Sequence, residues 1–386
     1  MLDKKLIDKE FAHLRDVIFL NAASVVIPPK SVQAAYHGFM DEYVDRFGEG
    51  VVDRAWEIVE EARHEVAHLI GARPTEIGFV KNTSEGIGII ANGYPFTQGD
   101  NVVTVDQEHS SNLFAWIKLQ EKGVKLRVVE SRNGEIRLKD IFSRVTARTR
   151  AISLSAVQFT TGFYTDLATL GSFCERHGIL LIVDGIQAVG RLHIDVKTMK
   201  ISYLACGGNK GLLATLGAGF VFCDEDLVEQ IIPPYASYQS VTNQLHPPAI
   251  TQDFDALAWR QNARRFESGN LNYAGIAAIC AGSALINRLG IENIQQQVMK
   301  LDEYLTQGLA ELPVDLRAPS RKQNHSGILC VYYPPEQEQQ VVEILKEHKI
   351  FATMRGGYIR LGINFYNTKK QMDTVIKAFE EIGKLT

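Results

Sequence analysis

The chain has 386 residues, of which 45% are hydrophobic, and its 41 basic and 45 acidic side chains give a net charge of −4. This length exceeds what one hydrophobic core usually supports, so we expect two domains. The sequence has no basic run and no apolar stretch near the ~20 residues that cross a bilayer, which argues against nucleic acid and membrane as partners. The charged N-terminus lacks the apolar region of a signal peptide and favours a cytoplasmic protein.

Five cysteines are spread along the chain and have mostly apolar neighbours. An odd number at wide spacing fits neither a disulfide framework nor a CxxC metal site. We therefore expect reduced thiols that fill the core, namely Cys174, Cys206, Cys223, Cys280 and Cys330.

The first eighty residues predict two helical regions and two strands. The helical regions follow from apolar positions that recur every three to four residues. In order, they are a helix over 3–15, a strand from Val17, a helical run over 31–71 that stops at Gly71, and a strand over Thr75–Val80.

An anion site is predicted where this last strand meets the next helix. The strand is followed by Lys81-Asn82-Thr83-Ser84-Glu85-Gly86 and then by an apolar helical run. The free amides at a helix start favour a phosphate, and the hydroxyls of Thr83 and Ser84 add donors. A simple capping box, with Thr83 or Ser84 as the cap, explains the same pattern equally well.

From residue 100 onward, strands and helices alternate. Such alternation predicts an α/β fold in which a mostly parallel sheet is covered by helices on both faces. The strands are Val102–Val105, Leu126–Val129, Ala151–Ser155 and Ile179–Val183, and the helices are 110–122, 138–143 and Leu167–His177. Two further strands, Tyr203–Ala205 and Gly217–Phe222, flank a glycine-rich turn around Lys210 like a hairpin.

The remainder predicts a second, smaller α+β unit. Proline pairs make 232–264 a long irregular connection, after which a helix over Tyr273–Leu289 crosses to the second domain. The later elements are a helix over 291–311, a strand over 327–332, a helix over 335–348, strands over 350–354 and 358–361, and a helix over 368–384. We therefore predict an N-terminal helical segment (1–15), a large domain (16–275) and a small domain (276–386).

Polar residues at the ends of the predicted strands indicate one site. Ligands of open α/β sheets bind beyond the carboxyl ends of the strands. The residues at those ends are Thr83, Ser84, His109, Gln158, Asp184 and Gln187, with Lys210 in its turn. Three of these residues also have a simpler interpretation: His109 as a surface or cap residue, Asp184 as a helix cap, and Lys210 as a solvated charge. No second ligand accompanies His109 at metal-binding spacing, which disfavours a metal site.

The familiar nucleotide motifs are missing from this set. Gly86-Ile87-Gly88 lies within a predicted helix and lacks the partners of a dinucleotide fingerprint, and no P-loop occurs. A phosphate cradle, a carboxylate, a flat-faced histidine and a lysine suit pyridoxal phosphate. The lysine forms an imine with its aldehyde, and the carboxylate keeps its ring nitrogen protonated. A carboxylate beside that cation should keep its own charge.

The sequence resembles class V aminotransferases, a group of fold-type-I pyridoxal-phosphate enzymes that also includes cysteine desulfurases, kynureninase and isopenicillin N epimerase-like proteins. The likeness covers nearly the whole chain, from Phe19 to Thr368. It rests on Glu108-His109-Ser110-Ser111-Asn112, Val183-Asp184-Gly185-Ile186-Gln187-Ala188-Val189-Gly190, a lysine before Gly211-Leu212-Leu213, Arg265-Phe266-Glu267-Ser268-Gly269, and Ile359-Arg360 with Phe365-Tyr366-Asn367-Thr368.

The resemblance implies a role for each position. Lys210 would be the Schiff-base lysine and proton shuttle, and Asp184 would pair with the ring nitrogen. Gln187 would bind the ring hydroxyl or imine side, His109 would stack on the ring, and Thr83 and Ser84 would hold the phosphate. Arg360 would bind the substrate carboxylate, with Asn21 and Gln158 as weaker candidates for the pocket. Relatives are usually homodimers with the site at the interface, so Asn270 would reach the partner's phosphate.

Three departures bear on the reaction. Gly207-Gly208-Asn209 replaces a common Ser-x-His before the lysine, and Gly269-Asn270 replaces Gly-Thr. Desulfurases carry a persulfide cysteine on a loop before the carboxylate-binding arginine, whereas Met354-Arg355-Gly356-Gly357-Tyr358-Ile359-Arg360 has no cysteine. We therefore expect an enzyme acting at the Cα of an amino acid or amine, with transamination first. A carbon–sulfur lyase, desulfurase-like or epimerase reaction is the alternative. A silent cofactor-binding sensor is a third, against which Lys210, Asp184 and Arg360 together argue.

Overall fold

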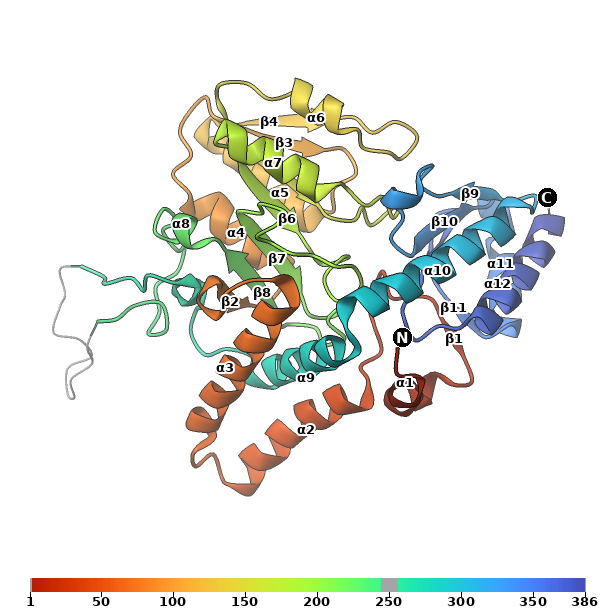
Figure 1. Ribbon diagram of the computed structural model, residues 1–386, viewed down its shortest axis with the longest axis horizontal. Helices are drawn as coiled ribbons and strands as arrows, with labels where there is room; N and C mark the ends of the chain where they lie inside the picture. The colour runs from red at the N-terminus through yellow and green to blue at the C-terminus, as the bar shows by residue number, and fades with distance from the viewer. Residues whose placement is uncertain (1, 244–255, 386) are drawn as a thin grey trace.

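The computed structural model describes residues 2–243 and 256–385, and its largest element is a seven-stranded sheet (Figure 1). The strand order is β2-β8-β7-β6-β5-β3-β4. The strands are β2 (Ile77–Val80), β3 (Asn101–Val105), β4 (Lys125–Val129), β5 (Thr149–Ser155), β6 (Leu180–Asp184), β7 (Tyr203–Gly207) and β8 (Gly219–Cys223).

The sheet is mostly parallel, as predicted. The pairs β3–β4, β3–β5, β5–β6 and β6–β7 are parallel, whereas β7–β8 and β2–β8 are antiparallel. The antiparallel β7–β8 pair confirms the hairpin-like arrangement around Lys210. Most of these strands are buried along their whole length, which explains their unbroken apolar sequences.

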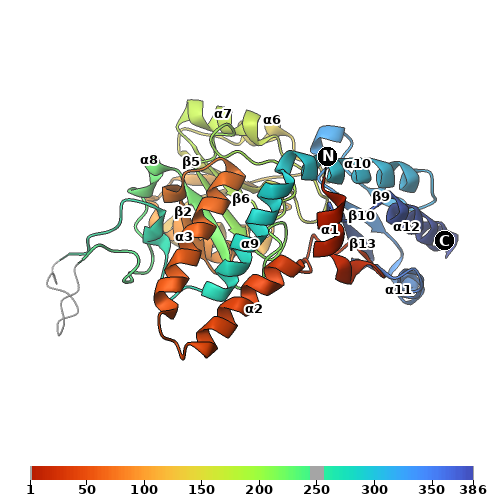
Figure 2. The same cartoon turned by 60° about the horizontal axis from the view of Figure 1, so that its bottom comes forward.

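Helices cover both faces of this sheet, so the predicted α/β class is confirmed. Alternate residues of β8 show the two faces. Phe220 and Phe222 belong to one core cluster with residues of helices α3 (Val51–Ile70), α7 (Leu167–His177) and α9 (Tyr273–Leu289), whereas Val221 belongs to another with residues of α4 (Thr83–Gly93) and α5 (Ser110–Lys118). A view turned by 60° shows α2 (Lys30–Asp45), α3 and α9 together on one side (Figure 2).

The predicted helical run over 31–71 is two helices, which corrects the sequence interpretation. Helix α2 spans Lys30–Asp45 and α3 spans Val51–Ile70. Between them Phe47, Gly48 and Gly50 have φ angles of 51°, 80° and 67°, a left-handed conformation that ends α2 and reverses the chain. The predicted stop at Gly71 is confirmed, because Gly71 is the left-handed C-cap of α3.

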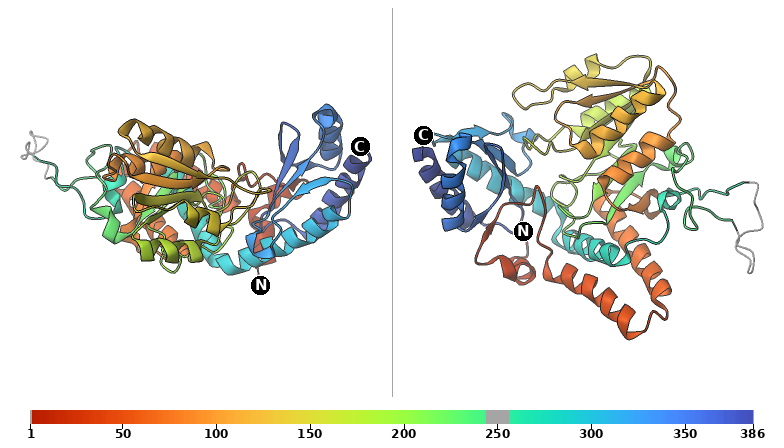
Figure 3. Two further views of the ribbon diagram at one scale, coloured as in Figure 1. Left: turned by 90° about the horizontal axis from the view of Figure 1, so that it is seen from above. Right: turned by 180° about the vertical axis from the view of Figure 1, so that it is seen from behind.

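The C-terminal unit is an antiparallel sheet with helices packed on it. Helix α9 leads directly into α10 (Ile291–Ala310), which extends along this unit (Figures 1 and 3). The sheet order is β12-β13-β10-β9. Its elements are β9 (Asp315–Arg317), β10 (Ile328–Tyr332), α11 (Glu338–Glu347), β12 (Thr353–Arg355), β13 (Tyr358–Gly362) and α12 (Lys369–Ile382). The sequence does not indicate β9, and the strand predicted over 350–354 divides into β11 (Ile350–Phe351) and β12.

The N-terminal segment packs against this C-terminal unit. Helix α1 (Lys4–Glu10) is followed by β1 (Ile18–Phe19), which pairs in parallel with β11. Ile18 and Leu20 belong to the apolar core of the C-terminal unit. The domain boundaries stay a prediction.

The irregular connection predicted over 232–264 is described only in part, because residues 244–255 lie outside the described residues. Its described parts contain an isolated bridge between Val241 and Trp259 and a 3-10 turn over Ala263–Phe266. In the Arg-Phe-Glu motif that follows this turn, Glu267 has a structural role. The Glu267 carboxylate accepts hydrogen bonds from Arg63 of α3 (2.9 Å) and from the Phe79 amide of β2 (3.0 Å).

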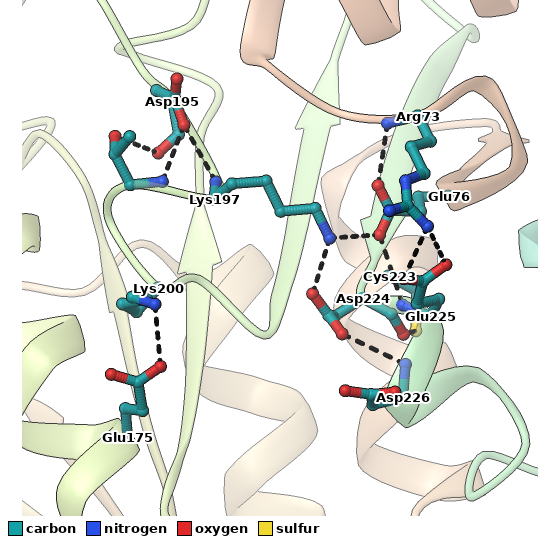
Figure 4. Close-up of polar contacts among 11 residues, drawn as sticks. Arg73, Glu76, Glu175, Asp195, Lys197, Lys200, Cys223, Asp224, Glu225 and Asp226 are labelled. Atoms are coloured by element: carbon teal, nitrogen blue, oxygen red, sulfur yellow. Dashed lines mark hydrogen bonds and ion pairs between the residues drawn. The ribbon is translucent and has the colours of Figure 1, made fainter.

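A second cluster of charges holds the connection between β6 and β7 (Figure 4). The Lys197 Nζ donates to Asp224 Oδ2 at 2.8 Å and to buried Glu76. Arg73 extends the cluster with an ion pair to Glu225. These contacts fasten residues 191–201 to β2 and β8, and so stabilise the chain that leaves the end of β6.

No single helix in the described part of the chain is long and apolar enough to cross a membrane; α9 and α10 meet the length and composition criteria only together, with a bend of 80° between them. Among the described residues, no three His, Cys, Asp or Glu side chains gather in a way that could bind a metal ion. The expected cytoplasmic location stays a prediction.

A buried ion pair in the C-terminal unit makes stability depend on pH. The His325 Nδ1 lies 2.5 Å from Asp302 Oδ1, and its Nε2 lies 2.8 Å from the Pro319 carbonyl. Both ring nitrogens face acceptors, so the imidazolium is favoured, and the hydrogen bond to Asp302 raises the pKa of His325. A raised pKa contributes stability that is fully present below the unfolded value of 6.5 and is lost as pH rises through the folded value.

We predict that His325→Gln lowers the free energy of unfolding by about 1–2 kcal/mol more at pH 6 than at pH 9. Denaturant unfolding at the two pH values measures this difference. The control is His193→Gln, because His193 is partly exposed and its nearest carboxylate, on Glu292, is 3.8 Å away. An equal loss at both pH values would show that the ion pair does not titrate in this range.

Candidate active site

Two glycine turns in direct contact bring Asp184 and Lys210 together. Asp184 ends β6, and Lys210 follows β7. A Cβ atom at Gly211 would lie 1.9 Å from the Val189 carbonyl oxygen, and one at Gly190 would lie 2.3 Å from the Gly211 carbonyl oxygen. Only glycine permits this backbone contact. The turns are therefore glycine-rich because they pack against each other.

Asp184 and Lys210 influence each other's charge inside this contact. Burial raises the pKa of Asp184, and the Lys210 cation opposes that rise. Burial lowers the pKa of Lys210, and the Asp184 carboxylate opposes that fall. Lys210 Nζ has no hydrogen bond or ion pair within the part of the chain that the structure describes. A lysine with a lowered pKa is more often neutral and nucleophilic.

Asp184 is poised for a positively charged partner. Its Oδ1 accepts the Ile186 amide at 3.0 Å, and only 2% of the residue is exposed. We expected this carboxylate to keep its charge beside a protonated ring. In the protein itself the pKa is raised, and a cation placed next to it would lower that pKa again.

Glu108 is a second buried carboxylate that the sequence analysis gave no role. Its oxygens accept four hydrogen bonds of 2.7–2.8 Å, from the Ser155 amide and hydroxyl and the side chains of Gln158 and Asn112. Ser155 pairs with Asp184 between β5 and β6, so Glu108 lies beside Asp184, whose pKa its charge raises. The motif containing Glu108 was visible, but a pattern cannot show that donors from a distant strand converge on it.

His109 is both a cap and a site residue. Its Nδ1 accepts the Ser111 amide at 3.1 Å as the N-cap of α5, which agrees with the simpler interpretation. Its ring also meets Phe159 edge-on, with 5.0 Å between ring centres. Burial lowers the pKa of His109, and the nearby charges of Lys210, Arg355 and Arg360 lower it further. The lowered pKa favours the neutral form of the His109 ring, and its stacking role stays a prediction.

Two buried glutamines present unpaired oxygens. The Gln158 amide donates to Glu108, and the Gln187 amide donates to the Ala23 carbonyl at 2.8 Å. Each Oε1 is buried and has no hydrogen-bond partner among the described residues. Buried acceptors without donors are costly, so these two suit a ligand that brings hydroxyl or N–H groups.

The start of α4 is the predicted phosphate end of the site. The cap is Asn82, whose Oδ1 accepts the Glu85 amide at 3.0 Å, so a cap at Thr83 or Ser84 is wrong. Thr83 Oγ1 accepts the Gly207 amide at 3.2 Å and joins α4 to the Lys210 turn. Thr83 is buried and Ser84 is exposed. Both hydroxyls remain able to donate to an anion at this helix start.

Asn270 lies on the exposed turn after Gly269. The Asn272 side chain, two residues on, donates to the Gly217 carbonyl at 3.1 Å, which fixes this turn near the loop after the Lys210 turn. The contact of Asn270 with a partner's phosphate stays a prediction.

Arg360 is a buried cation without a carboxylate. It donates to the Phe159 carbonyl (2.9 Å) and to the hydroxyls of Ser24 and Thr353. Thr353 also donates to Asn21, so Arg360 and Asn21, which were both predicted to bind the substrate, belong to one hydrogen-bond network. Burial lowers the pKa of Arg360, and no ion pair offsets its charge within the described residues. An anionic ligand would stabilise it.

The hairpin that carries Arg360 also carries Arg355, to which the sequence analysis gave no role. Strands β12 and β13 are joined by Gly356 and Gly357, whose φ angles are 50° and 89°. A two-residue glycine turn has no room for a cysteine-bearing loop. Arg355 is exposed at the start of this turn.

The thiols are core residues, as expected. All five cysteines are free; Cys280 is half-buried and the others are buried. Burial raises the pKa of Cys330 to about 12 and the pKa of Cys206 well above its ordinary value. The charges of Asp184 and Lys210 act on Cys206 and the charge of Arg360 acts on Cys330, and the raised pKa values favour the neutral thiol in both.

The family model for aminotransferase class-V matches residues 17–375. The chain belongs to this family. The predicted resemblance and the fold-type-I α/β architecture are confirmed.

The names of several similar proteins refer to reactions at a carbon–sulfur bond. The chain is 32% identical to a probable cysteine desulfurase of Methanothermobacter thermautotrophicus, over 96% of each chain. A solved cysteine desulfurase of Thermococcus onnurineus NA1 is 26% identical, with a TM-score of 0.89 over 100% of this chain and 99% of that one. A C-DES variant with glycine covalently linked to its PLP cofactor is 21% identical and shares the fold, with a TM-score of 0.88 over 97% and 99%.

The cofactor of this chain is pyridoxal 5'-phosphate, as predicted. The residues present fit it on their own geometry. Lys210 is an unpaired lysine, Asp184 a buried carboxylate with an oxygen to spare, and Gln187 an unpaired buried acceptor. The individual cofactor contacts stay predictions.

We predict that Gly211→Ala weakens cofactor binding and lowers the free energy of unfolding by about 1–3 kcal/mol, because the methyl group overlaps the Val189 carbonyl. The matched control is Gly88→Ala in α4, where a Cβ meets nothing within 4 Å. That change should stabilise the helix by up to about 1 kcal/mol. Unfolding midpoints and cofactor titrations measure both. Wild-type cofactor affinity in Gly211→Ala would show that the contact does not organise the site.

Proposed function

We propose that the chain breaks the carbon–sulfur bond at the Cβ of cysteine or an S-substituted cysteine. The sequence alone favours transamination; the names of the relatives favour the carbon–sulfur alternative instead. The observation that carries the proposal is the 32% identity to a probable cysteine desulfurase over 96% of both chains. The two groups that such a reaction needs, a proton acceptor and a carboxylate binder, are Lys210 and Arg360.

The residues divide the work as follows. The cofactor, when bound, supplies an electron sink for the pair left at the substrate Cα. Arg360 binds the substrate carboxylate, and its burial excludes competing water. Lys210, with its lowered pKa, takes the Cα proton. The Asp184 carboxylate would stabilise the positive charge on the ring nitrogen of the bound cofactor. Glu108 accepts a hydrogen bond from the Gln158 amide and so keeps that side chain in place.

The sulfur leaves with its own substituent in this proposal. A desulfurase reaction that yields alanine passes sulfur to a thiolate on the protein. The β12–β13 turn has no cysteine, and burial raises the pKa of Cys330 to about 12. Elimination needs no such thiol. One S-substituted cysteine and one water give one thiol or persulfide, one pyruvate and one ammonium ion, without a change of oxidation state.

We also propose a homodimer, as the family resemblance implies. Helix α2 and the turn after it expose Met40, Tyr43, Val44 and Phe47, and 98% of Phe47 is accessible. Met40, Tyr43 and Val44 recur at i, i+3 and i+4 within α2, which places them on one face of that helix, and Phe47 lies in the turn that follows it. An apolar face of this kind is typical of a protein–protein contact.

We predict that the enzyme loaded with its cofactor acts on cysteine or its S-substituted derivatives. It should release sulfide, a thiol or a persulfide together with equimolar pyruvate and ammonium. Lys210→Ala should reduce this rate by roughly 100-fold or more, because no other group takes the Cα proton. The matched control is Lys200→Ala, a surface lysine paired with Glu175 at 2.9 Å (Figure 4), which should keep wild-type rates. Amino-group exchange between alanine and a 2-oxo acid without sulfur release would contradict the proposal and favour transamination.

A further inference from the structure

We propose that Glu108 stays ionised beside Asp184 and so makes Asp184 a stronger base toward the ring nitrogen of the bound cofactor. Glu108 would not touch the reacting atoms; it is a positioning residue that acts through Asp184. This role goes beyond carbon–sulfur cleavage, because it holds for any reaction that needs a protonated ring nitrogen. It rests on the predicted pairing of Asp184 with that nitrogen.

Four donors surround the Glu108 carboxylate. Its Oε1 accepts the Ser155 amide and the Gln158 side chain, both at 2.7 Å. Its Oε2 accepts the Ser155 hydroxyl at 2.7 Å and the Asn112 side chain at 2.8 Å. Trp116 fixes the orientation of Asn112, because the indole N–H can only donate and lies 3.0 Å from Asn112 Oδ1. The Asn112 NH₂ group must therefore point toward Glu108.

This donor set favours the charged form of Glu108. A protonated carboxyl needs an acceptor for its own O–H, whereas the Ser155 amide and the Asn112 NH₂ group cannot accept. One of these two groups faces each carboxylate oxygen. Burial raises the pKa of Glu108, and its hydrogen bonds oppose that rise. A carboxylate that accepts several hydrogen bonds is stabilised in its ionised form.

The network behind Glu108 holds the carboxylate in place. The Ser153 hydroxyl donates to Asn112 Oδ1 at 2.7 Å, and Trp116 Nε1 lies 2.9 Å from the same hydroxyl oxygen. Asn112, Trp116 and Ser153 are all buried. If Glu108 turned away, buried donors would lose their acceptor, which is costly. The negative charge is therefore fixed in position.

Asp184 lies next to this fixed charge and has fewer donors of its own. Ser155, which binds Glu108, pairs with Asp184 between β5 and β6. Among the described residues, the Asp184 carboxylate accepts one hydrogen bond, from the Ile186 amide at 3.0 Å. Two buried carboxylates side by side favour one shared proton. The carboxylate with fewer donors, Asp184, is the one that takes it.

The charges that face Asp184 act in opposite directions. Burial raises the pKa of Asp184, the Glu108 charge raises it further, and the Lys210 cation lowers it. Burial also raises the pKa of the neighbouring Cys206 thiol, which favours its neutral form. When a protonated ring binds, Asp184 releases its proton to solvent and pairs with the ring cation. Glu108 then attracts the same cation, so the ring nitrogen holds its proton more tightly.

The test measures the protonation of a bound ring directly. Pyridoxamine 5'-phosphate is the probe, because it has an amine in place of the aldehyde and forms no covalent bond with Lys210. Nitrogen NMR of this compound, labelled at the ring nitrogen and bound to the full chain, follows ring protonation as pH rises. Glu108→Gln should lower the midpoint of this titration by about 1–2 pH units.

Two further variants separate charge from structure. Glu108→Asp keeps the charge and should recover most of the shift. Glu10→Gln is the matched control, because Glu10 is also buried and accepts the Ser31 amide at 2.8 Å, whereas the carboxylate that acts on Asp184 is Glu108. It should leave the midpoint unchanged. Circular dichroism of each variant checks that it is folded.

A second measurement needs no variant of Glu108. Infrared difference spectra at pH 6, with and without pyridoxamine 5'-phosphate, should show the loss of one carboxylic acid C=O band on binding. This loss should be absent in Asp184→Asn. A loss that persists in Asp184→Asn would assign the proton to Glu108 and overturn the inference.

The NMR outcomes are equally decisive. Equal midpoints in the wild type and Glu108→Gln would overturn the inference. So would an equal decrease in Glu108→Gln and Glu108→Asp, because it would show that the hydrogen bonds matter and the charge does not. No substrate is present in either measurement, so a failure here leaves carbon–sulfur cleavage standing, and a failure to release sulfur leaves this inference standing.

Discussion

The contact between the turns at Gly190 and Gly211 is the constraint on which the site depends. One turn carries Asp184 at the end of β6, and the other carries Lys210 after β7. Because the two backbones touch with no room for a Cβ atom, their charged side chains are held in one buried space. The shifted pKa values of Asp184 and Lys210 follow from that burial. The charge cluster at Lys197, at the opposite end of the strands, stabilises the chain between the two turns.

The site has opposite charges on its two sides. Carboxylates of Asp184 and Glu108 lie together at the ends of β5 and β6, where four donors stabilise Glu108. The C-terminal unit contributes the cations Arg360 and Arg355 from one hairpin. Lys210 lies between them and responds to both sets of charges. An anionic substrate carboxylate on the cationic side and a protonated ring on the acidic side therefore match the field of the protein.

Local pattern predicted most of the fold, because the elements that carry it are regular. The helix Tyr273–Leu289 has the predicted bounds, and each strand of the parallel sheet lies close to its expected position. The division between α2 and α3 was missed although Gly48 and Gly50 were visible, since the helical spacing continues on both sides of them. The left-handed conformation of these glycines decides the break.

The partners of the site residues were harder to predict than the residues themselves. Strand-end position was enough to select Asp184, Gln187 and His109. It could not identify Glu108, three of whose four hydrogen bonds come from Ser155 and Gln158, about 50 positions away, or Arg355, whose face depends on hairpin register. It also suggested a cap at Thr83 or Ser84, whereas Asn82 caps the helix. These contacts depend on residues far apart in the sequence or on the identity of a single residue, and the spacing of residue types does not predict them.

The proposed elimination differs from a desulfurase reaction at one point: sulfur never resides on the chain. The most direct test is the mass of the intact protein, trapped with an alkylating reagent while it turns over cystine or cysteine. For the elimination we expect the mass of the alkylated protein alone, with sulfur recovered in solution as sulfide or a persulfide. A population that carries one added sulfur atom, mapped to Cys330 or any other cysteine, would contradict it.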